Sequence, residues 1–243
     1  MLVNFAMPFC RSYNTELKEK TMNCETSYRG VKKCVINDYP FDVTWDDSLI
    51  YPLFENCYNS LLEDHSHINN SYYSNEQGGI IRLEYIDHYV ILCYRLANKM
   101  WKTGYSALAD AVYYSMRIRG SIDLYYRTEI GRCFIVAHAI GTIMDSHAAY
   151  GQFFRIYNGC HIGPYSLFGK KPNEWIHPKF GDFVTMLGHS KVYGKTVIGN
   201  NVIISAQTLI INETIPDNCI VSGMSPNLFY KPLKPGSQGI KKD

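Results

Sequence analysis

The chain has 243 residues, 46% of them hydrophobic, which is enough to bury the core of one large domain or two modest ones. Its 24 basic and 22 acidic residues give a net charge of +2 without an extended basic block, so the charge indicates no nucleic-acid partner. No apolar run approaches the roughly 20 residues that cross a bilayer, and the apolar N-terminus lacks the positive cluster that begins a signal peptide. We therefore expect a globular cytoplasmic protein with no membrane insertion.

The eight cysteines are spread along the chain, and none forms a Cys-x-x-Cys pair. This spacing is typical of reduced thiols and not of a disulfide framework or a zinc site. Asp64, His65 and His67 resemble a set of metal ligands, but no further ligand group lies near them. We expect a solvated loop at these residues and no bound metal.

The first part of the chain predicts helices. Residues 1–45 show no clean hydrophobic period, so we expect them to be irregular. A helix is predicted over residues 49–62, behind a capping aspartate at Asp46 or Asp47. The clearest helix covers residues 84–102, where one apolar stripe repeats at helical spacing. That stripe consists of Val90, Cys93, Tyr94, Ala97, Met100 and Trp101.

A break at Thr103 and Gly104 separates this helix from another. Ser106 is predicted to cap a helix that runs through Arg119, and Gly120 is expected at its C-terminal end. Residues 1–121 are therefore predicted to form a mainly helical N-terminal domain.

The later part of the chain repeats every six residues. Val192, Ile198, Ile204 and Ile210 recur at this period, which is too long for one strand and wrong for a helix. Three short strands per turn of a β-helix fit it, because each turn then buries one aliphatic residue per face. We expect this β-helix over residues 122–232, with a loop rich in Gly, Pro and Lys at about 164–178 and a tail at 233–243.

Asp123 and His138 are the leading candidates for chemistry. A histidine whose pKa is near 6.5 is a natural general base for a hydroxyl group. An aspartate about one turn of the coil earlier would accept a hydrogen bond from the other ring nitrogen and fix the tautomer. The sequence therefore predicts that Asp123 orients His138 as the base.

Several motifs in the same order carry a family resemblance. They are Tyr94-Arg95-Leu96-Ala97-Asn98-Lys99-Met100-Trp101, Ile122-Asp123, Glu129-Ile130-Gly131-Arg132, His138-Ala139-Ile140-Gly141, Ile176-His177-Pro178-Lys179 and Gly223-Met224-Ser225-Pro226. The chain resembles the serine acetyltransferase branch of the hexapeptide-repeat acyltransferases from about residue 88 to Pro232. The resemblance implies an α+β protein: a helical N-terminal domain followed by a left-handed parallel β-helix, assembled as a homotrimer.

The resemblance also implies acetyl-CoA in a groove between neighbouring subunits. His177 matches the second active-site histidine of the family. Gly188 and Ala206 fall where small residues meet the pantetheine arm, and Lys231 falls where a cation meets a nucleotide phosphate. By the same resemblance, Asp123 and His138 are the catalytic pair.

Two departures from the family bear on the acceptor. Ala137 replaces an acidic residue and Ile176 replaces an arginine, and in the family these charges hold the ammonium and carboxylate of serine. Their loss leaves a zwitterion without partners, so serine is disfavoured. The chain also resembles serine acetyltransferase-like proteins of surface-polysaccharide synthesis, from Asn70-Ser71-Tyr72-Tyr73-Ser74 to Ser225-Pro226-Asn227-Leu228.

We therefore predict O-acetylation of a sugar hydroxyl in a surface polysaccharide, capsule or O-antigen, or in its precursor. Three alternatives stay open at this point: a serine O-acetyltransferase of cysteine biosynthesis, a non-catalytic trimeric scaffold, and an acetyltransferase that acts on xenobiotics.

Overall fold

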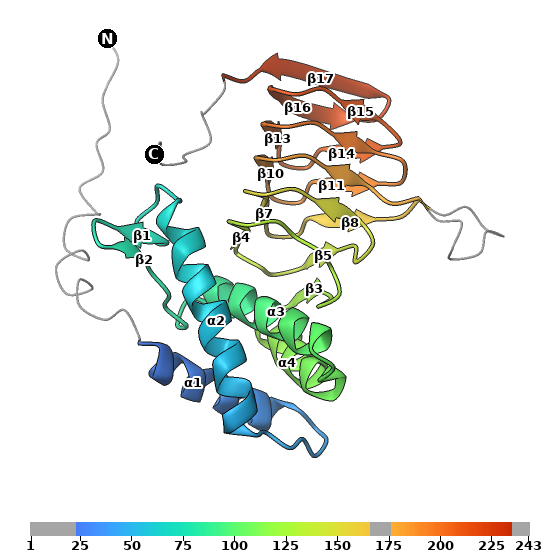
Figure 1. The fold of residues 1–243 in the computed structure, drawn as a ribbon. Coiled ribbons are helices and arrows are strands. Elements are labelled where there is room, and N and C mark those ends of the chain that lie inside the picture. Colours follow the sequence, from blue (N-terminus) through green and yellow to red (C-terminus); the bar gives the residue numbers. More distant parts are fainter. Residues whose placement is uncertain (1–22, 166–175, 235–243) are drawn as a thin grey trace, which may run out of the picture.

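The structure is a computed structural model, which describes residues 23–165 and 176–234. Four helices precede a stack of parallel strands (Figure 1). The helices are α1 (Cys24–Asp38), α2 (Asp47–Ser66), α3 (Ile86–Lys102) and α4 (Ser106–Gly120), and an antiparallel pair, β1 (Ser74–Asn75) and β2 (Gly78–Gly79), lies between α2 and α3.

Helix α1 lies within the region that was expected to be irregular. Asn23 caps it, because its side chain accepts a hydrogen bond from the amide of Thr26. Tyr28, Val31 and Val35 are buried along one face of this helix. The prediction for residues 1–45 is thus wrong for this helix, since the short stripe is interrupted by polar residues and gives only a weak period.

The other helices follow the predicted ranges with shifted ends. Asp46 caps α2 as expected, and the helix runs on to Ser66. Ser106 is the first residue of α4 and not its cap, because Tyr105 holds the cap position without a side-chain hydrogen bond. The turn into the coil is made instead by Ser121, whose φ is 50°.

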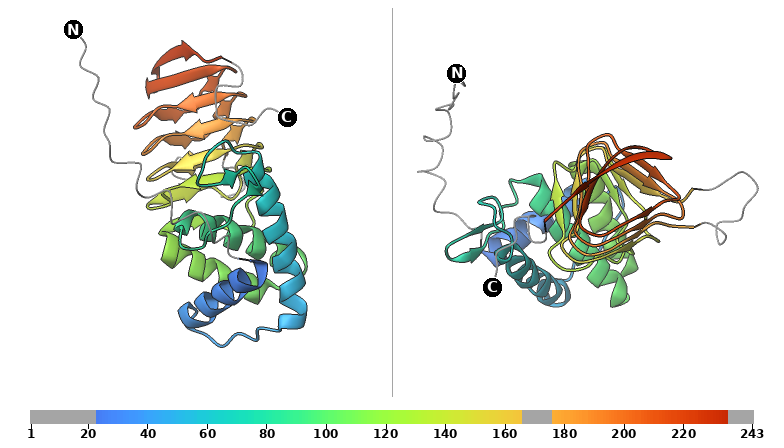
Figure 2. Two further views of the ribbon diagram at one scale, coloured as in Figure 1. Left: turned by 90° about the vertical axis from the view of Figure 1, so that its left-hand side faces the viewer. Right: turned by 90° about the horizontal axis from the view of Figure 1, so that it is seen from above.

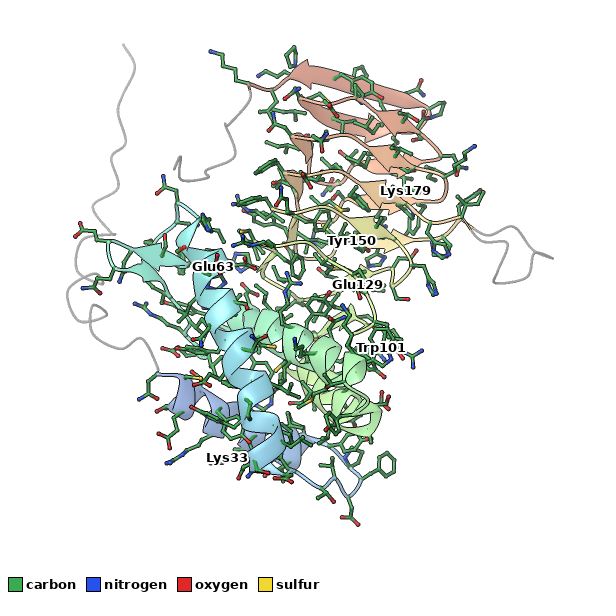
Figure 3. All side chains as sticks on the ribbon, viewed as in Figure 1. Lys33, Glu63, Trp101, Glu129, Tyr150 and Lys179 are labelled. Carbon is green, nitrogen blue, oxygen red and sulfur yellow. The ribbon has the colours of Figure 1, made fainter. Side chains whose placement is uncertain are left out.

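Helix α3 joins the helical region to the coil. Its predicted stripe is buried except for Trp101, which is partly exposed. On the coil side, Arg95 donates hydrogen bonds to the carbonyls of Ile130 and Gly131, and Tyr94 donates to the carbonyl of Thr128. The polar residues of the Tyr94–Trp101 motif therefore satisfy backbone groups at the open end of the coil. Trp101, labelled in Figure 3, lies near this junction.

The coil has three faces of parallel strands. The first contains β3 (Ile122–Leu124), β5 (Thr142–Met144), β8 (His161–Gly163), β11 (Lys191–Tyr193) and β14 (Leu209–Ile211). The second contains β4 (Ile135–Ala137), β7 (Arg155–Tyr157), β10 (Val184–Met186), β13 (Val202–Ile204) and β16 (Cys219–Met224). The third contains β6 (Ala149–Tyr150), β9 (Lys179–Phe180), β12 (Val197–Ile198) and β15 (Thr214–Ile215). Figure 2 shows the stacked turns from the side and end on.

The six-residue period corresponds to these faces. Val192, Ile198, Ile204 and Ile210 lie on β11, β12, β13 and β14, and each is at most 2% exposed. Tyr150, labelled in Figure 3, is likewise buried inside the coil. A final strand, β17 (Asn227–Pro232), pairs with β16 in antiparallel fashion and ends the parallel stack.

The number of residues between paired strands indicates where the predicted loop leaves the coil. Val184 pairs with Val202, 18 residues later, whereas Arg155 pairs with Thr185, 30 residues later. One turn therefore carries an insertion, as predicted for residues 164–178, although residues 166–175 lie outside the described part. Most of the predicted tail, from residue 235, lies outside it as well.

The helices and the cysteines bear on two of the expectations drawn from composition. In the described part of the chain, no helix is long and apolar enough to cross a bilayer. The cysteines at 24, 34, 57, 93, 133, 160 and 219 are free thiols. The cytoplasmic location stays a prediction.

Candidate functional site

Asp123 and His138 do not meet within one chain. The Asp123 carboxylate accepts a 2.6 Å hydrogen bond from the hydroxyl of Tyr113 and lies 3.4 Å from the guanidinium of Arg117. Among the described residues the His138 ring has no hydrogen-bond partner, and it lines a cavity that excludes Asp123. The predicted pairing therefore fails within a single chain, because Asp123 belongs to β3 on the first face and His138 follows β4 on the second.

His138 lies at an enlarged corner of the coil. Ala137 pairs with Tyr157 and Ile143 pairs with His161, so residues 138–142 span a corner that residues 158–160 span one turn later. The two extra residues include His138, which has a φ of 57° and an exposed side chain. A non-glycine residue in this conformation needs support from its surroundings.

Asp87 in the first turn of α3 supplies that support. Its carboxylate accepts a 2.9 Å hydrogen bond from the amide of His138 and a 3.1 Å hydrogen bond from the amide of Ala139. These two amides are thus not free to stabilise an oxyanion. No sequence pattern pointed to Asp87, because only the fold brings the start of α3 to this corner.

The His138 cavity has a volume of about 440 Å³ and lies between the coil and the segments before α3. Tyrosines form much of its wall: Tyr72, Tyr73 and Tyr85 come from the segments before α3, and Tyr157 comes from β7. Arg155, on the same strand as Tyr157, adds a cationic group.

A second cavity of about 940 Å³ lies on the other side of the same corner, along the first face. His177 and Asp123 line it together with Tyr193 and residues of β5 and β8. His138 and His177 are therefore not brought together in one chain. They face two cavities that flank one corner.

His177 has the oriented geometry that was expected of His138. Its Nδ1 lies 2.6 Å from Oδ2 of Asp145, and the side chains are 19% and 5% exposed. With the carboxylate ionised, the tautomer that fits protonates Nδ1 and leaves Nε2 as an acceptor. Asp145 was missed because it lies 32 residues before His177, and no spacing rule connects the two.

Asp145, His147 and His177 also form a potential metal-ligand group. They offer one ligand atom each, all within 4.8 Å of one another, and the donor types suit zinc. The 2.6 Å separation of Asp145 from His177 is that of a charge-assisted hydrogen bond, which already accounts for their closeness. The expectation of no bound metal stays a prediction.

Tyr113 holds Asp123 at the rim of the larger cavity. Burial and then the hydrogen bond to Asp123 raise the pKa of Tyr113 well above its usual value. The tyrosine therefore stays protonated and donates its hydrogen bond to the Asp123 carboxylate on this rim.

Gly188 and Ala206, predicted to contact the cofactor, belong to the column of corners that continues from the His138 corner toward the C-terminal end of the stack. Backbone hydrogen bonds connect successive corners: the amide of Gly159 donates to Ile140, that of His189 to Asn158, and that of Gln207 to Gly188. Ala206 is exposed in this column. Gly188, which is partly exposed, and Ala206 are thus small, accessible residues in successive corners along this edge of the coil.

Lys231, predicted to contact a nucleotide phosphate, lies at the far end of the stack. It is exposed on β17 and pairs with Ile220 of β16. Four strand spacings separate β4 from β16, which amounts to about 19 Å.

Two buried histidines pack against each other beside the His138 cavity, and His88 forms part of its wall. His65 is 0% exposed and His88 is 1% exposed, so the solvated loop predicted at His65 is wrong. His65 Nδ1 lies 2.6 Å from the carbonyl of Ile80, and His88 Nδ1 accepts a hydrogen bond from the amide of Arg82. Burial above all lowers the pKa of His65 to about 4 and that of His88 to about 3, so both rings are neutral at pH 7.

Sequence and structure comparisons agree on the relatives of this chain. No family model matches it. The serine acetyltransferase of Mycobacterium tuberculosis is 30% identical over 144 residues, which cover 56% of this chain and 61% of that protein. The chain thus spans less than two thirds of that relative's length.

Solved structures match the fold. The serine acetyltransferase of Brucella abortus has a TM-score of 0.66 at 18% identity, covering 87% of this chain and 84% of that one. A serine acetyltransferase in complex with CoA has a TM-score of 0.56 at 16% identity, covering 84% and 76%. The predicted fold, a helical domain followed by a left-handed parallel β-helix, is confirmed. In sequence the chain is thus similar to serine acetyltransferases, and in architecture it is similar to solved serine acetyltransferases.

Proposed function

We propose that the protein is an acetyl-CoA-dependent O-acetyltransferase. The observation that carries this proposal is the buried carboxylate of Asp145, 2.6 Å from a histidine that faces a large open cavity. Relatives named serine acetyltransferase support the same reaction type, and a protein of the same fold was solved with CoA.

The chemistry follows from the two histidines. A hydroxyl is un-ionised at neutral pH and has to lose its proton as it attacks the thioester carbonyl. A positioned histidine accelerates this step by roughly 10²- to 10⁴-fold. We assign proton removal to His138, as the resemblance implies, and we assign acceptor positioning or a share of the proton transfer to His177, held by Asp145. The acetyl group then passes directly to the hydroxyl oxygen, and CoA leaves as the thiol.

The separation of the two histidines supports a shared site. His138 and His177 line different cavities of one chain, on either side of one corner. In a homotrimer of parallel coils, the His138 corner of one subunit faces the His177 cavity of its neighbour, and Asp123 of that neighbour then comes within reach of His138. We assign acetyl-CoA to the edge of the coil that carries Gly188 and Ala206, with Lys231 toward the nucleotide end.

The acceptor is the finer part of the proposal. The relatives' names favour L-serine, and so a role in cysteine biosynthesis, over the sugar acceptor expected from the sequence. One observation supports the sugar as a second candidate: Tyr72, Tyr85 and Tyr157 line the His138 cavity, and aromatic faces stack on sugar rings. A polysaccharide or capsule precursor is therefore the alternative acceptor.

The test measures CoA release from acetyl-CoA with L-serine and with sugar acceptors. The wild type is expected to release CoA only when an acceptor is present. His138→Ala and His177→Ala should each lose at least about 100-fold in turnover while the trimer persists in light scattering. His67→Ala, whose histidine lines neither cavity, is the matched control. Absence of acceptor-dependent CoA release would contradict the proposal and favour a non-catalytic trimeric scaffold.

A further inference from the structure

Arg155 is a cation without a partner among the described residues. It is half-buried on β7, and no hydrogen bond or ion pair within the described ranges involves its guanidinium. Other described arginines have their charges or donors engaged: Arg29 with Glu25, Arg95 with two carbonyls, Arg117 with Asp123, Arg119 with Asp38, and Arg132 with Glu63 and Asp64. Holding an unpaired guanidinium partly out of water is unfavourable unless an anion arrives to pair with it.

One carboxylate of the same cavity, that of Asp87, is already engaged. Both oxygens of Asp87 accept hydrogen bonds from the amides of the His138 corner. Glu84 is exposed and forms no ion pair with Arg155. The buried hydroxyl of Tyr73 donates to the carbonyl of Val136, and burial keeps the pKa of Tyr73 above its usual value, so it supplies no anion. Within the described residues, therefore, no carboxylate of the cavity is paired with the guanidinium of Arg155.

Arg155 lies within reach of the corner that carries His138. It pairs with Ile135, three residues before His138, on the neighbouring strand of the second face. Three residues along a strand and one strand spacing across it amount to about 11 Å between Cα atoms, and both side chains line the same cavity. A small molecule can therefore contact the guanidinium with one group while it presents a hydroxyl to the imidazole.

We propose that Arg155 binds the carboxylate of the acceptor whose hydroxyl is acetylated at His138. This inference rests on the proposed O-acetyl transfer and specifies its acceptor as a hydroxyl-bearing carboxylate. A planar guanidinium forms two parallel hydrogen bonds to a carboxylate, which fixes the acceptor's orientation as well as its charge. The shared chemistry has two sources, a hydroxy amino acid such as serine or an acidic sugar such as a uronate.

With Arg155 in this role, serine is no longer disfavoured as an acceptor on account of its carboxylate. Ala137 and Ile176 leave two family positions without charge, and the sequence alone therefore disfavoured a zwitterion. Arg155 supplies a cation from another strand of the same cavity, so a carboxylate has a partner there after all. The exposed carboxylate of Glu84 lines the same cavity, where it can pair with the ammonium group of an amino acid.

The experiment compares acceptors that differ in their carboxylate. L-serine is paired with L-serinamide, and glucuronate is paired with glucose, each tested with the wild type, Arg155→Ala and Arg155→Lys. We expect Arg155→Ala to raise KM at least about 30-fold for the carboxylate acceptor and less than about threefold for its neutral partner. KM for acetyl-CoA should not change. Arg155→Lys should restore part of the loss, since it keeps the charge without the planar fork. Arg29→Ala, an exposed arginine of α1, is the matched control.

Binding of the same four acceptors, measured by calorimetry without acetyl-CoA, separates the two proposals. If no acceptor is acetylated but a carboxylate acceptor binds and Arg155→Ala abolishes that binding, the proposed function fails and the assignment of Arg155 stands. If acetylation proceeds and Arg155→Ala affects charged and neutral acceptors equally, or neither, the assignment of Arg155 is overturned. The pair that responds, serine or glucuronate, identifies the source of the carboxylate.

Discussion

The buried pair of His65 and His88 predicts a specific dependence of stability on pH. Both rings are neutral in the folded protein, with pKa values of about 4 and about 3, whereas an unfolded histidine has a pKa near 6.5. Asp64, Arg82 and Tyr73 face the pair. Because the folded pKa values are depressed, the unfolded state binds more protons below pH 6.5. Stability is therefore complete above pH 6.5 and is lost as the pH falls toward the folded pKa values.

The size of the effect follows from the two pKa values. At pH 5 an unfolded histidine is almost fully protonated while each buried ring remains neutral, which corresponds to about 2 kcal/mol per histidine. The pair therefore lowers the free energy of unfolding by about 4 kcal/mol between pH 7.5 and pH 5. His88→Asn retains an acceptor for the amide of Arg82 without a titrating ring, so this variant should lose about 2 kcal/mol less over the same range.

Urea unfolding followed by circular dichroism, at one protein concentration and at both pH values, measures this difference. The other titrating groups are common to the wild type and the variant, so their contributions cancel. Equal pH dependence in the two proteins would refute the reasoning, because it would mean that His88 is protonated in the folded state.

Two further predictions concern the hydrogen bond between Asp145 and His177 and the buried face of β12. In the CoA-release assay, Asp145→Asn should lower kcat at least about 100-fold while the fold is retained, because the amide no longer selects the His177 tautomer. Asp42 is an exposed aspartate between α1 and α2, and Asp42→Asn should leave kcat unchanged in the same assay. In β12, Ile198→Ala should destabilise the protein by about 3 kcal/mol in urea unfolding, because Ile198 is 2% exposed. Val197→Ala, at a neighbouring position that is 42% exposed, should lower the free energy of unfolding by less than about 0.5 kcal/mol. Similar losses at both positions would contradict the assignment of the coil interior.

The sequence predicted the repeating parts of the fold well. The apolar stripe of α3 and the six-residue period from Val192 to Ile210 both arise from burial against a regular scaffold, and regular burial leaves a period in the sequence. Helix α1 leaves little such signal, since its buried face is short and is interrupted by polar residues. Residues 1–45 were for this reason misassigned.

The site was less predictable, because its contacts are made between elements far apart in the chain. His138 and His177 could be named from motifs that resemble the family. Asp87, Asp145 and Arg155 could not, because a helix terminus, a corner and a strand bring them to the site only after the coil has closed. The pairing of Asp123 with His138 was inferred from a separation along the chain, and in the folded coil that separation places them on two different faces.

In the proposed mechanism, acetyl transfer uses His138 of one subunit and His177 of its neighbour. The most direct test mixes the inactive variants His138→Ala and His177→Ala in equal amounts, after unfolding and refolding together, and measures acceptor-dependent CoA release. With random assembly of trimers, about one site in four receives both histidines intact, so we predict recovery of about a quarter of the wild-type activity. A mixture as inactive as either variant alone would contradict a site shared between subunits.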